Sequence, residues 1–251
     1  KKIKKVLITK DYLINNFEKF VKANEGPIGG IAQFGLFKVC DQAKKDGFDV
    51  ILSGFGLDEC FGSYKSIKKK IKSKSFELID SKIISNEAVI NKDKFSNISK
   101  KINDYFFKIK IPRTTHMVDR SSMYHSIEMR LPFLETKFVE KSVSMINKSE
   151  KIDKSLIRNY MQKNCKSKNN WLSPKVHVPH PQNSWLKKGK FSNWVENLLY
   201  DNFLYKKVSF LNKKKVISKW KEFKNSDNEN ASGYLFWQLI NLYFFVKNFS
   251  R

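Results

Sequence analysis

The sequence predicts an α/β fold that begins with a parallel sheet and continues as a mostly helical second part. Two short apolar runs, at residues 5–9 and 48–52, enclose two segments whose apolar side chains recur at helical spacing. A glycine-containing loop follows the second run, and after residue 64 only helical patterns recur. Strand, helix, helix, strand and glycine loop in this order are typical of parallel α/β sheets.

Each element of the first part follows from its own pattern. The runs at 5–9 and 48–52 are expected to be strands, the second of them buried, because both are short and apolar. Residues 11–23 and 31–46 are expected to be helices, separated by a break at 24–30 that is rich in Gly and Pro. The loop after the second strand lies at a carboxyl strand end, where parallel sheets place their ligands.

The second part contains further segments with helical spacing. They span residues 97–108, 117–127, 135–146, 154–164, 191–202, 213–224 and 232–248. The stretch 165–190 is expected to be the main irregular segment, because Pro174, Pro179 and Pro181 interrupt it. A long proline-rich loop inside a helical region is typical of a functional loop or a lid.

Composition excludes several protein classes. Of the 251 residues 41% are hydrophobic, and 21 Phe, 9 Tyr and 5 Trp can build a core, so wholesale disorder is excluded. No run approaches the ~18 apolar residues of a membrane helix, and no membrane partner is expected. Three cysteines without close spacing (Cys40, Cys60 and Cys165) exclude a disulfide scaffold or a cysteine-rich zinc site and are typical of the reducing cytoplasm.

The formal net charge of +25 first suggests a nucleic-acid partner. However, only five of the 49 basic residues are arginine. Arginine makes the bidentate contacts on which recognition of phosphates and bases usually depends, so the composition argues against nucleic acid. A basic nucleic-acid-binding domain stays open as a minor alternative, and the positive charge can still attract anionic substrates such as nucleotides.

The loop after the second strand, SGFGLDECFGSY, is the most informative segment. Gly54 and Gly56 let the backbone approach a ligand closely, and Ser53 with its neighbouring amides can hold phosphate or ribose oxygens. Asp58 and Glu59 add paired carboxylates, which beside a polyphosphate are typical ligands of Mg²⁺. For this segment alone, a plain strand-to-helix turn with a capping Asp is the favoured interpretation.

Two further segments follow the loop in order, namely DRSSMYHSIEMRLPFLETKFVE from Asp119 and PKVHVPHPQNSW from Pro174. The three segments together resemble the synthetase domain of glutamine-hydrolysing asparagine synthetases. The loop resembles S-G-x-G-x-D-E-x-x-x-G-Y, the second segment D-R-x-S-M-x-x-S-x-E-x-R-x-P-F-L and the third K-x-G-F-x-x-P-x-x-x-W. The resemblance covers about residues 5–190.

The resemblance implies a fold and a reaction. The fold is an adenine-nucleotide hydrolase-like (HUP or PP-loop) α/β domain over residues 1–190, incomplete at its N-terminus, with a helical extension at 191–251 packed on it. The reaction needs ATP and Mg²⁺, because a carboxylate is adenylated before ammonia attacks the acyl carbon. Aspartate is the default substrate and another carboxylate the alternative, and a glutaminase domain or partner chain would supply ammonia from glutamine.

The resemblance also implies roles for individual residues. Three residues of the loop correspond to nucleotide contacts: Ser53, Gly54 and Gly56. Asp58, with Glu59 beside it, corresponds to the ligand of Mg²⁺ and pyrophosphate. Lys175 corresponds to the catalytic lysine that stabilises charge on the adenylate and on the tetrahedral intermediate.

Three departures from the family pattern bear on activity. The pyrophosphate loop S-G-G-x-D-S and the glutaminase domain are absent, so the chain is interpreted as the downstream portion of a longer synthetase or one half of a split one. Phe55 stands where asparagine synthetases carry Glu and β-lactam synthetases carry Tyr, and a phenyl ring cannot exchange protons. His177 and Val178 replace Gly and Phe in the lysine segment.

Several alternatives stay open. A catalytically silent or split-subunit remnant of such a synthetase agrees with the missing loop, whereas Phe55 argues against a ring-closing enzyme of the β-lactam type. Glu128 and Arg130 could be a buried ion pair or functional residues, with equal weight. Cys60 is interpreted as a small buried thiol, and the histidines form no zinc pattern with the cysteines.

Overall fold

The structure is a computed structural model of the chain. It describes residues 3–26, 28–60, 108, 110–148, 155–165, 180–226 and 233–250. The described elements are, in chain order, α1 (Lys10–Asn24), α2 (Ile31–Lys45), β1 (Val50–Leu52), α3 (Leu57–Cys60), α6 (Ile111–Met123), β2 (Glu128–Arg130), the 3₁₀ turn η3 (Pro132–Leu134), α7 (Thr136–Lys148), α8 (Ser155–Asn164), α9 (Gln182–Lys187), α10 (Lys190–Tyr200), α11 (Phe203–Lys207), α12 (Lys213–Asn225) and α13 (Tyr234–Phe249).

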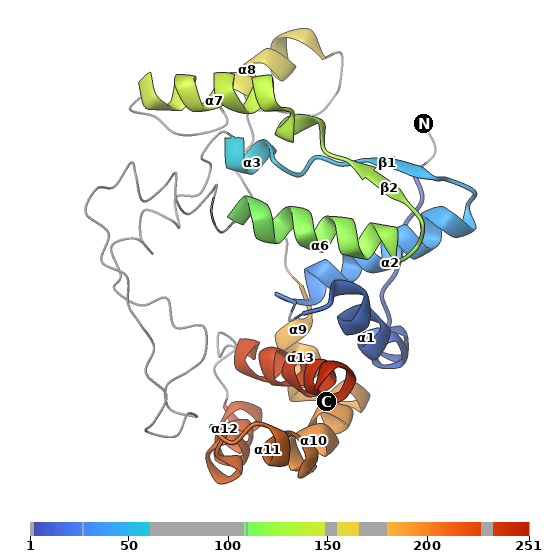
Figure 1. Cartoon of the computed structure of the whole chain (residues 1–251), viewed down its shortest axis with the longest axis vertical. Helices are drawn as coiled ribbons and strands as arrows, with labels where there is room; N and C mark the ends of the chain where they lie inside the picture. The colour runs from blue at the N-terminus through green and yellow to red at the C-terminus, as the bar shows by residue number, and fades with distance from the viewer. Residues whose placement is uncertain are drawn as a thin grey trace.

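These elements lie in layers along the long axis of the molecule. Figure 1 shows β1 and β2 side by side next to α6, with α2 and α1 below them and the C-terminal helices α10 to α13 at the far end. Both α2 and α1 contact α6, and α13 contacts α1 and α10. The part of the chain that the structure describes is therefore mostly helical and contains one small parallel sheet.

The first two helices form where apolar spacing predicts them, so the helices expected at 11–23 and 31–46 are confirmed as α1 and α2. Thr9 caps the start of α1, because its hydroxyl accepts a hydrogen bond from the backbone N–H of Tyr12 at 3.1 Å. Both helices turn their apolar side chains into one shared core. These side chains are Leu13, Phe17, Phe20, Val21, Ile31, Phe34 and Phe37.

Residues 3–9 are not a strand, so the strand expected at 5–9 is wrong. Among the described residues no strand pairs with this segment, because the sheet there consists of β1 and β2 only. The segment is instead tied to the end of α2, where the Lys4 ammonium lies 2.5 Å from an Asp46 carboxylate oxygen. Leu7 is exposed, while Ile8 packs against the core.

The described sheet is a parallel pair in which Val50 lies opposite Glu128 and Leu52 opposite Arg130. The sequence did not predict β2, and the expectation that strands end after residue 64 is wrong. The reason is that β2 reads Glu-Met-Arg and contains only one apolar residue, Met129, which packs against the core. Such a short strand with charged ends has no strand signature of its own.

One face of this sheet is open. Phe48, Val50 and Leu52 are 59%, 41% and 74% exposed, and they alternate along the chain, so they share a face. The strand expected at 48–52 therefore exists but is shorter, and the expectation that it is buried is wrong. Parallel sheets are normally covered on both faces, so this uncovered face departs from the usual pattern.

The main core joins α1 and α2 to the C-terminal helices. Trp220 and Trp237 are fully buried. The Trp237 ring lies 5.2 Å from that of Phe17, and its indole N–H donates to the carbonyl oxygen of Ile28 at 3.0 Å. The Asn241 side-chain oxygen accepts from the Ile28 N–H at 3.2 Å, so α13 satisfies both backbone groups of Ile28 in the loop before α2.

Helical spacing predicts most of the later helices. Five expected segments are confirmed as α7, α8, α10, α12 and α13. The helix expected at 117–127 is wrong in its bounds, since α6 starts at Ile111 and the chain turns toward β2 after Met123. The short helix α9 lies inside the stretch 165–190, which is therefore not irregular throughout, and α11 was not predicted. The helix expected at 97–108 lies outside the described residues except for its last position.

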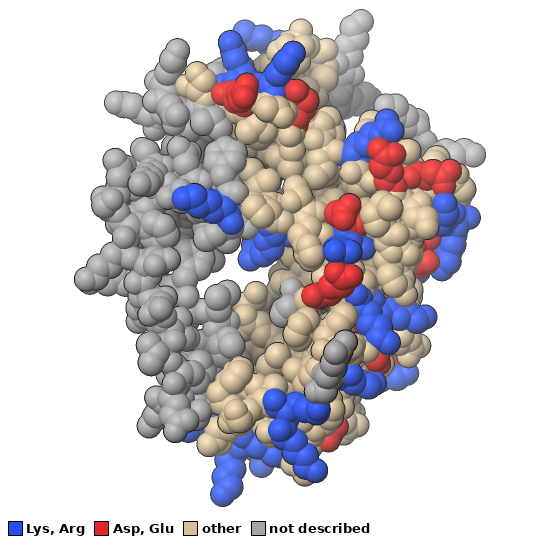
Figure 2. All heavy atoms as spheres, in the orientation of Figure 1, with Lys and Arg blue, Asp and Glu red and all other residues tan. Residues whose placement is uncertain are grey.

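Within the described ranges, no helix is both long and apolar enough to cross a membrane. Figure 2 shows the lysine and arginine side chains scattered over the visible face and intermixed with acidic ones, rather than gathered in a single stripe. A continuous basic stripe is the usual footprint of a nucleic-acid-binding surface. The visible face therefore adds no support to the nucleic-acid alternative.

Candidate functional site

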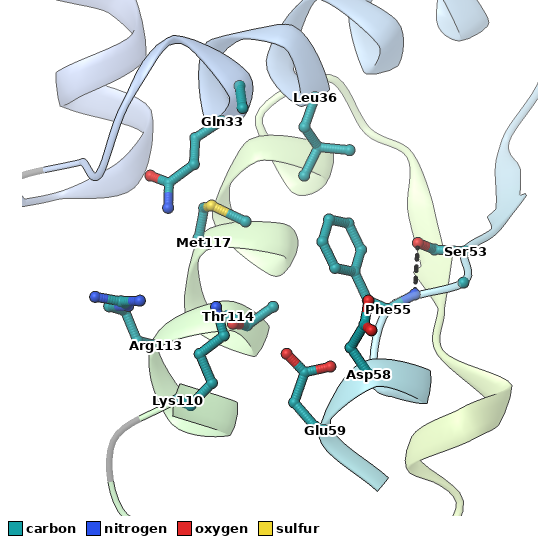
Figure 3. A pocket seen from close by; sticks show the side chains of 12 residues that line it. Gln33, Leu36, Ser53, Phe55, Asp58, Glu59, Lys110, Arg113, Thr114 and Met117 are labelled. Atoms are coloured by element: carbon teal, nitrogen blue, oxygen red, sulfur yellow. Dashed lines mark hydrogen bonds between the residues drawn. The ribbon is translucent and has the colours of Figure 1, made fainter. Parts of the chain in front are cut away.

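A cavity of about 490 Å³ lies at the carboxyl end of β1. Its walls come from α2, the loop after β1, α3 and α6, as Figure 3 shows. The lining residues are Ala32, Gln33, Leu36, Ser53, Gly54, Phe55, Asp58, Glu59, Lys110, Arg113, Thr114 and Met117. Of the six site residues predicted by the sequence, four line this one cavity, namely Ser53, Gly54, Asp58 and Glu59.

Ser53 and Gly54 form the wall next to the sheet. The Ser53 N–H donates to the carbonyl oxygen of Arg130 at 3.0 Å and so extends the contact between the strands by one residue. The Ser53 hydroxyl accepts from the Phe55 N–H at 3.3 Å, which shapes the turn. A methyl group added at Gly54 would meet no atom within 4 Å, so the backbone here is open to a ligand.

Gly56 does not line the cavity. It has a positive φ of 97°, and a methyl group added there would lie 2.6 Å from the side chain of Leu134 in η3. The close approach of η3 and the left-handed backbone both require glycine at this position. The structure therefore gives Gly56 a packing role, and its predicted contact with a nucleotide stays a prediction.

Asp58 and Glu59 occupy the first turn of the short helix α3, and both line the cavity. No cluster of three or more His, Cys, Asp or Glu side chains that could hold a metal occurs in the part of the chain that the structure describes. Two carboxylates still fit Mg²⁺, because this ion usually binds one or two protein carboxylates and takes its other ligands from phosphates and water.

The cavity wall formed by α6 carries charged residues that the sequence analysis missed. Lys110, the residue before α6, and Arg113 on α6 lie on one side of the cavity, while Asp58 and Glu59 project from α3 on the other (Figure 3). The sequence signal for these residues is a pair of basic residues three positions apart at the start of a helix, just before the D-R-x-S-M motif. This pair does not stand out in the sequence, because lysine is common throughout the chain.

In the upper part of Figure 3 the apolar side chains of Leu36, Phe55 and Met117 face the cavity, next to the amide of Gln33. Phe55, the residue that departs from the family pattern, points into the cavity and packs partly against the core. The cavity therefore combines an apolar end with a charged end, an arrangement that suits a ligand with a flat apolar group and an anionic tail.

Of the other residues that the sequence analysis singled out, some lie outside the described residues and others lie outside this cavity. Lys175, the predicted catalytic lysine, lies outside the described residues, as do His177 and Val178. Glu128 and Arg130 form an ion pair of 2.8 Å whose side chains are 58% and 60% exposed, so the interpretation as a buried pair is wrong. The hydrogen bond from Arg130 holds the pKa of the Glu128 carboxyl below its ordinary value.

Cys60 and His125 are structural. The Cys60 thiol is buried and donates to the carbonyl oxygen of Phe133 at 3.1 Å, which confirms the interpretation as a buried thiol. Burial also raises the pKa of this thiol, so it is a poor nucleophile. His125 packs with its ring 4.4 Å from that of Phe37, and burial lowers its pKa.

Comparison with known proteins identifies the family of the chain. The family model for asparagine synthase matches residues 2–113 and 106–245. Over 110 residues, which are 44% of this chain, the sequence is 26% identical to a Methanocaldococcus jannaschii protein described as a glutamine-hydrolyzing asparagine synthetase. That match spans only 17% of the relative's length. The family implies an adenine-nucleotide hydrolase-like fold. The two matches to the family model together cover most of the 251 residues of this chain, so the chain belongs to the asparagine synthase family.

Proposed function

We propose that the chain is the C-terminal synthetase portion of a cytoplasmic, ATP- and Mg²⁺-dependent enzyme that forms an amide. The observation that carries the proposal is the cavity at the carboxyl end of β1, where Ser53, Gly54, Asp58 and Glu59 meet. This is where parallel α/β sheets bind their ligands. Three free cysteines agree with the reducing cytoplasm.

The reaction has two steps. A substrate carboxylate attacks the α-phosphorus of ATP, and pyrophosphate leaves with the electrons of the broken P–O bond. Ammonia then attacks the acyl carbon, AMP leaves and an amide remains. Aspartate is the default substrate, and another carboxylate is the alternative, because no residue of the described cavity identifies the substrate side chain.

The chain's own residues would hold and orient the reactants. Ser53 and Gly54 would present hydroxyl and backbone groups to the nucleotide, while Asp58 and Glu59 would hold Mg²⁺. Bound Mg²⁺ would supply neutralisation of the phosphate charge. Lys175 would stabilise negative charge on the adenylate and on the tetrahedral intermediate.

Phe55 favours ammonia as the attacking amine. A phenyl side chain cannot accept a proton, so a weakly nucleophilic amine would lack a base at this position. Free ammonia does not need one. A glutaminase domain or a partner chain would release that ammonia from glutamine.

Two substitutions test the roles of the residues. Asp58→Asn is expected to weaken binding of MgATP about tenfold or more, measured by calorimetry, while Mg²⁺-free adenosine binds as before. The exposed carboxylate Glu140 on α7 provides the control, since Glu140→Gln should change neither affinity.

Lys175→Ala is expected to abolish amide formation and leave the fold intact, as checked by circular dichroism. Wild-type turnover of that variant would exclude the role of Lys175.

The second candidate is a catalytically silent or split-subunit remnant of such a synthetase. The observation that favours it is the exposed outer face of β1, because parallel sheets are normally covered on both faces. The test is exchange of labelled pyrophosphate into ATP in the presence of aspartate. Pyrophosphate exchange by this chain alone would exclude the hypothesis of a silent remnant. Exchange only after addition of a polypeptide that carries an S-G-G-x-D-S loop would identify a split enzyme.

A further inference from the structure

The charged end of the cavity contains two opposed pairs of side chains. Asp58 and Glu59 lie on the α3 side and Lys110 and Arg113 on the α6 side, around a space of about 490 Å³ (Figure 3). A polyphosphate next to two carboxylates alone would be repelled. Cations on the facing wall offset that repulsion, and a magnesium ion held by the carboxylates would place a third positive centre beside the phosphates.

Arg113 differs from the neighbouring arginines in having no protein partner in the described part of the chain. Arg120, two turns later on α6, lies 3.0 Å from Glu25, and Arg130 lies 2.8 Å from Glu128. Arg113 is exposed on the helix and lines the cavity without such an ion pair. Its guanidinium fork is therefore available to a ligand, and its planar geometry suits bidentate contacts to phosphate oxygens.

We propose that Arg113, with Lys110 beside it, binds the pyrophosphate end of the nucleotide from the α6 wall, opposite Asp58 and Glu59. The apolar end of the cavity, with Leu36, Phe55 and Met117, would then face the base. The assignment rests on the proposed function, and it adds to that function an anion-binding wall formed by α6.

The test is calorimetry on the full chain at one fixed ionic strength. The ligands are inorganic pyrophosphate with Mg²⁺, ATP with Mg²⁺, and adenosine. Arg113→Ala is expected to weaken binding of pyrophosphate and ATP about tenfold or more and to leave adenosine unchanged. Arg113→Lys keeps the charge but loses the fork, so an intermediate loss is expected.

Arg120→Ala is the matched control, because it removes the same charge from the same helix at a site that does not line the cavity. It corrects for the general attraction that a net charge of +25 exerts on any anion. Equal affinities of Arg113→Ala and Arg120→Ala for pyrophosphate would overturn the proposal. Pyrophosphate binding that depends on Arg113 without any adenosine binding would keep this anion site and overturn the nucleotide function, and no binding of any ligand would overturn both.

Discussion

The helical core and the cavity region of this molecule are built in opposite ways. Around α1, α10, α12 and α13, aromatic side chains pack against one another in edge-to-face, tilted and stacked contacts, with Trp220 and Trp237 fully buried. Around β1, α3 and α6, charged side chains surround a hollow, and the outer face of the sheet is exposed. The main core and the proposed site are therefore located in different parts of the chain, and substitutions should separate their effects on stability and on ligand binding.

Replacing Trp237 is expected to have the largest effect on folding. Trp237→Ala removes a fully buried ring and the hydrogen bond to Ile28, so the free energy of unfolding should fall by about 3–5 kcal/mol. Urea denaturation followed by circular dichroism measures it. Phe249→Ala, on the same helix but 44% exposed, is the control and should cost much less. Equal losses of unfolding free energy in Trp237→Ala and Phe249→Ala would show that α13 does not anchor the core.

A pair of glycines tests the boundary between the two regions. Gly56→Ala should lower the free energy of unfolding by about 3 kcal/mol, because the methyl group meets Leu134 at 2.6 Å and φ is positive. Gly54→Ala places its methyl in open space, so stability should be unchanged while ATP affinity falls, since the cavity narrows there. Thermal melts and ATP titrations measure the two effects. A destabilised Gly54→Ala variant would contradict the separation.

The carboxylate of Asp41 on α2 stabilises the fold through its lysine partners, so the stability of the protein should depend on pH. Burial alone would raise the pKa of Asp41, but hydrogen bonds from Lys45 and Lys38 outweigh burial and lower the pKa from 3.8 to about 2. Because the folded pKa is depressed, the stabilisation is present above pH ~4 and is lost as pH falls toward ~2, about 2 kcal/mol in all. Unfolding of wild type and Asp41→Asn should therefore differ at pH 7 and converge near pH 2. A constant difference across this range would exclude Asp41 as the cause.

The ion pair on the open sheet face should have the smallest effect. Glu128 and Arg130 are both largely exposed, so water and salt screen their attraction. Glu128→Gln is expected to leave the urea midpoint unchanged within error. A clear loss of stability would mean that another polypeptide segment covers this face in solution. Measuring the urea midpoint after adding other segments of asparagine synthase family proteins would then show which segment binds the face.

The sequence predicted the helices better than the sheet, for a physical reason. A helix such as α1 carries its signal in its own spacing, since Leu13, Phe17, Phe20 and Val21 recur on one face. The strand β2 has no such signal, because Glu128 and Arg130 point away from the core and only the pairing with β1 makes the segment a strand. The segment 5–9 shows the converse, an apolar run that no strand pairs with in the described residues.

The same distinction explains the site. Ser53, Gly54, Asp58 and Glu59 are neighbours in the sequence, so one motif revealed all four. Arg113 and Leu36 reach the same cavity from α6 and α2, and only the packing of these helices against the loop brings them there. The sequence predicts Gly56 as a nucleotide contact, and only the fold reveals that Gly56 also packs against Leu134, which is distant in sequence.

The exposed face of β1 also affects the tendency of the protein to aggregate. An exposed apolar strand face and, in the described residues, an unpaired strand edge invite a second copy to pair there. The net charge of +25 keeps copies apart by repulsion. Salt shortens the range of that repulsion from about 10 Å at 0.1 M to about 3 Å at 1 M. We therefore expect the isolated chain to stay dispersed in dilute buffer and to aggregate as salt is added, in contrast to proteins that salt keeps in solution.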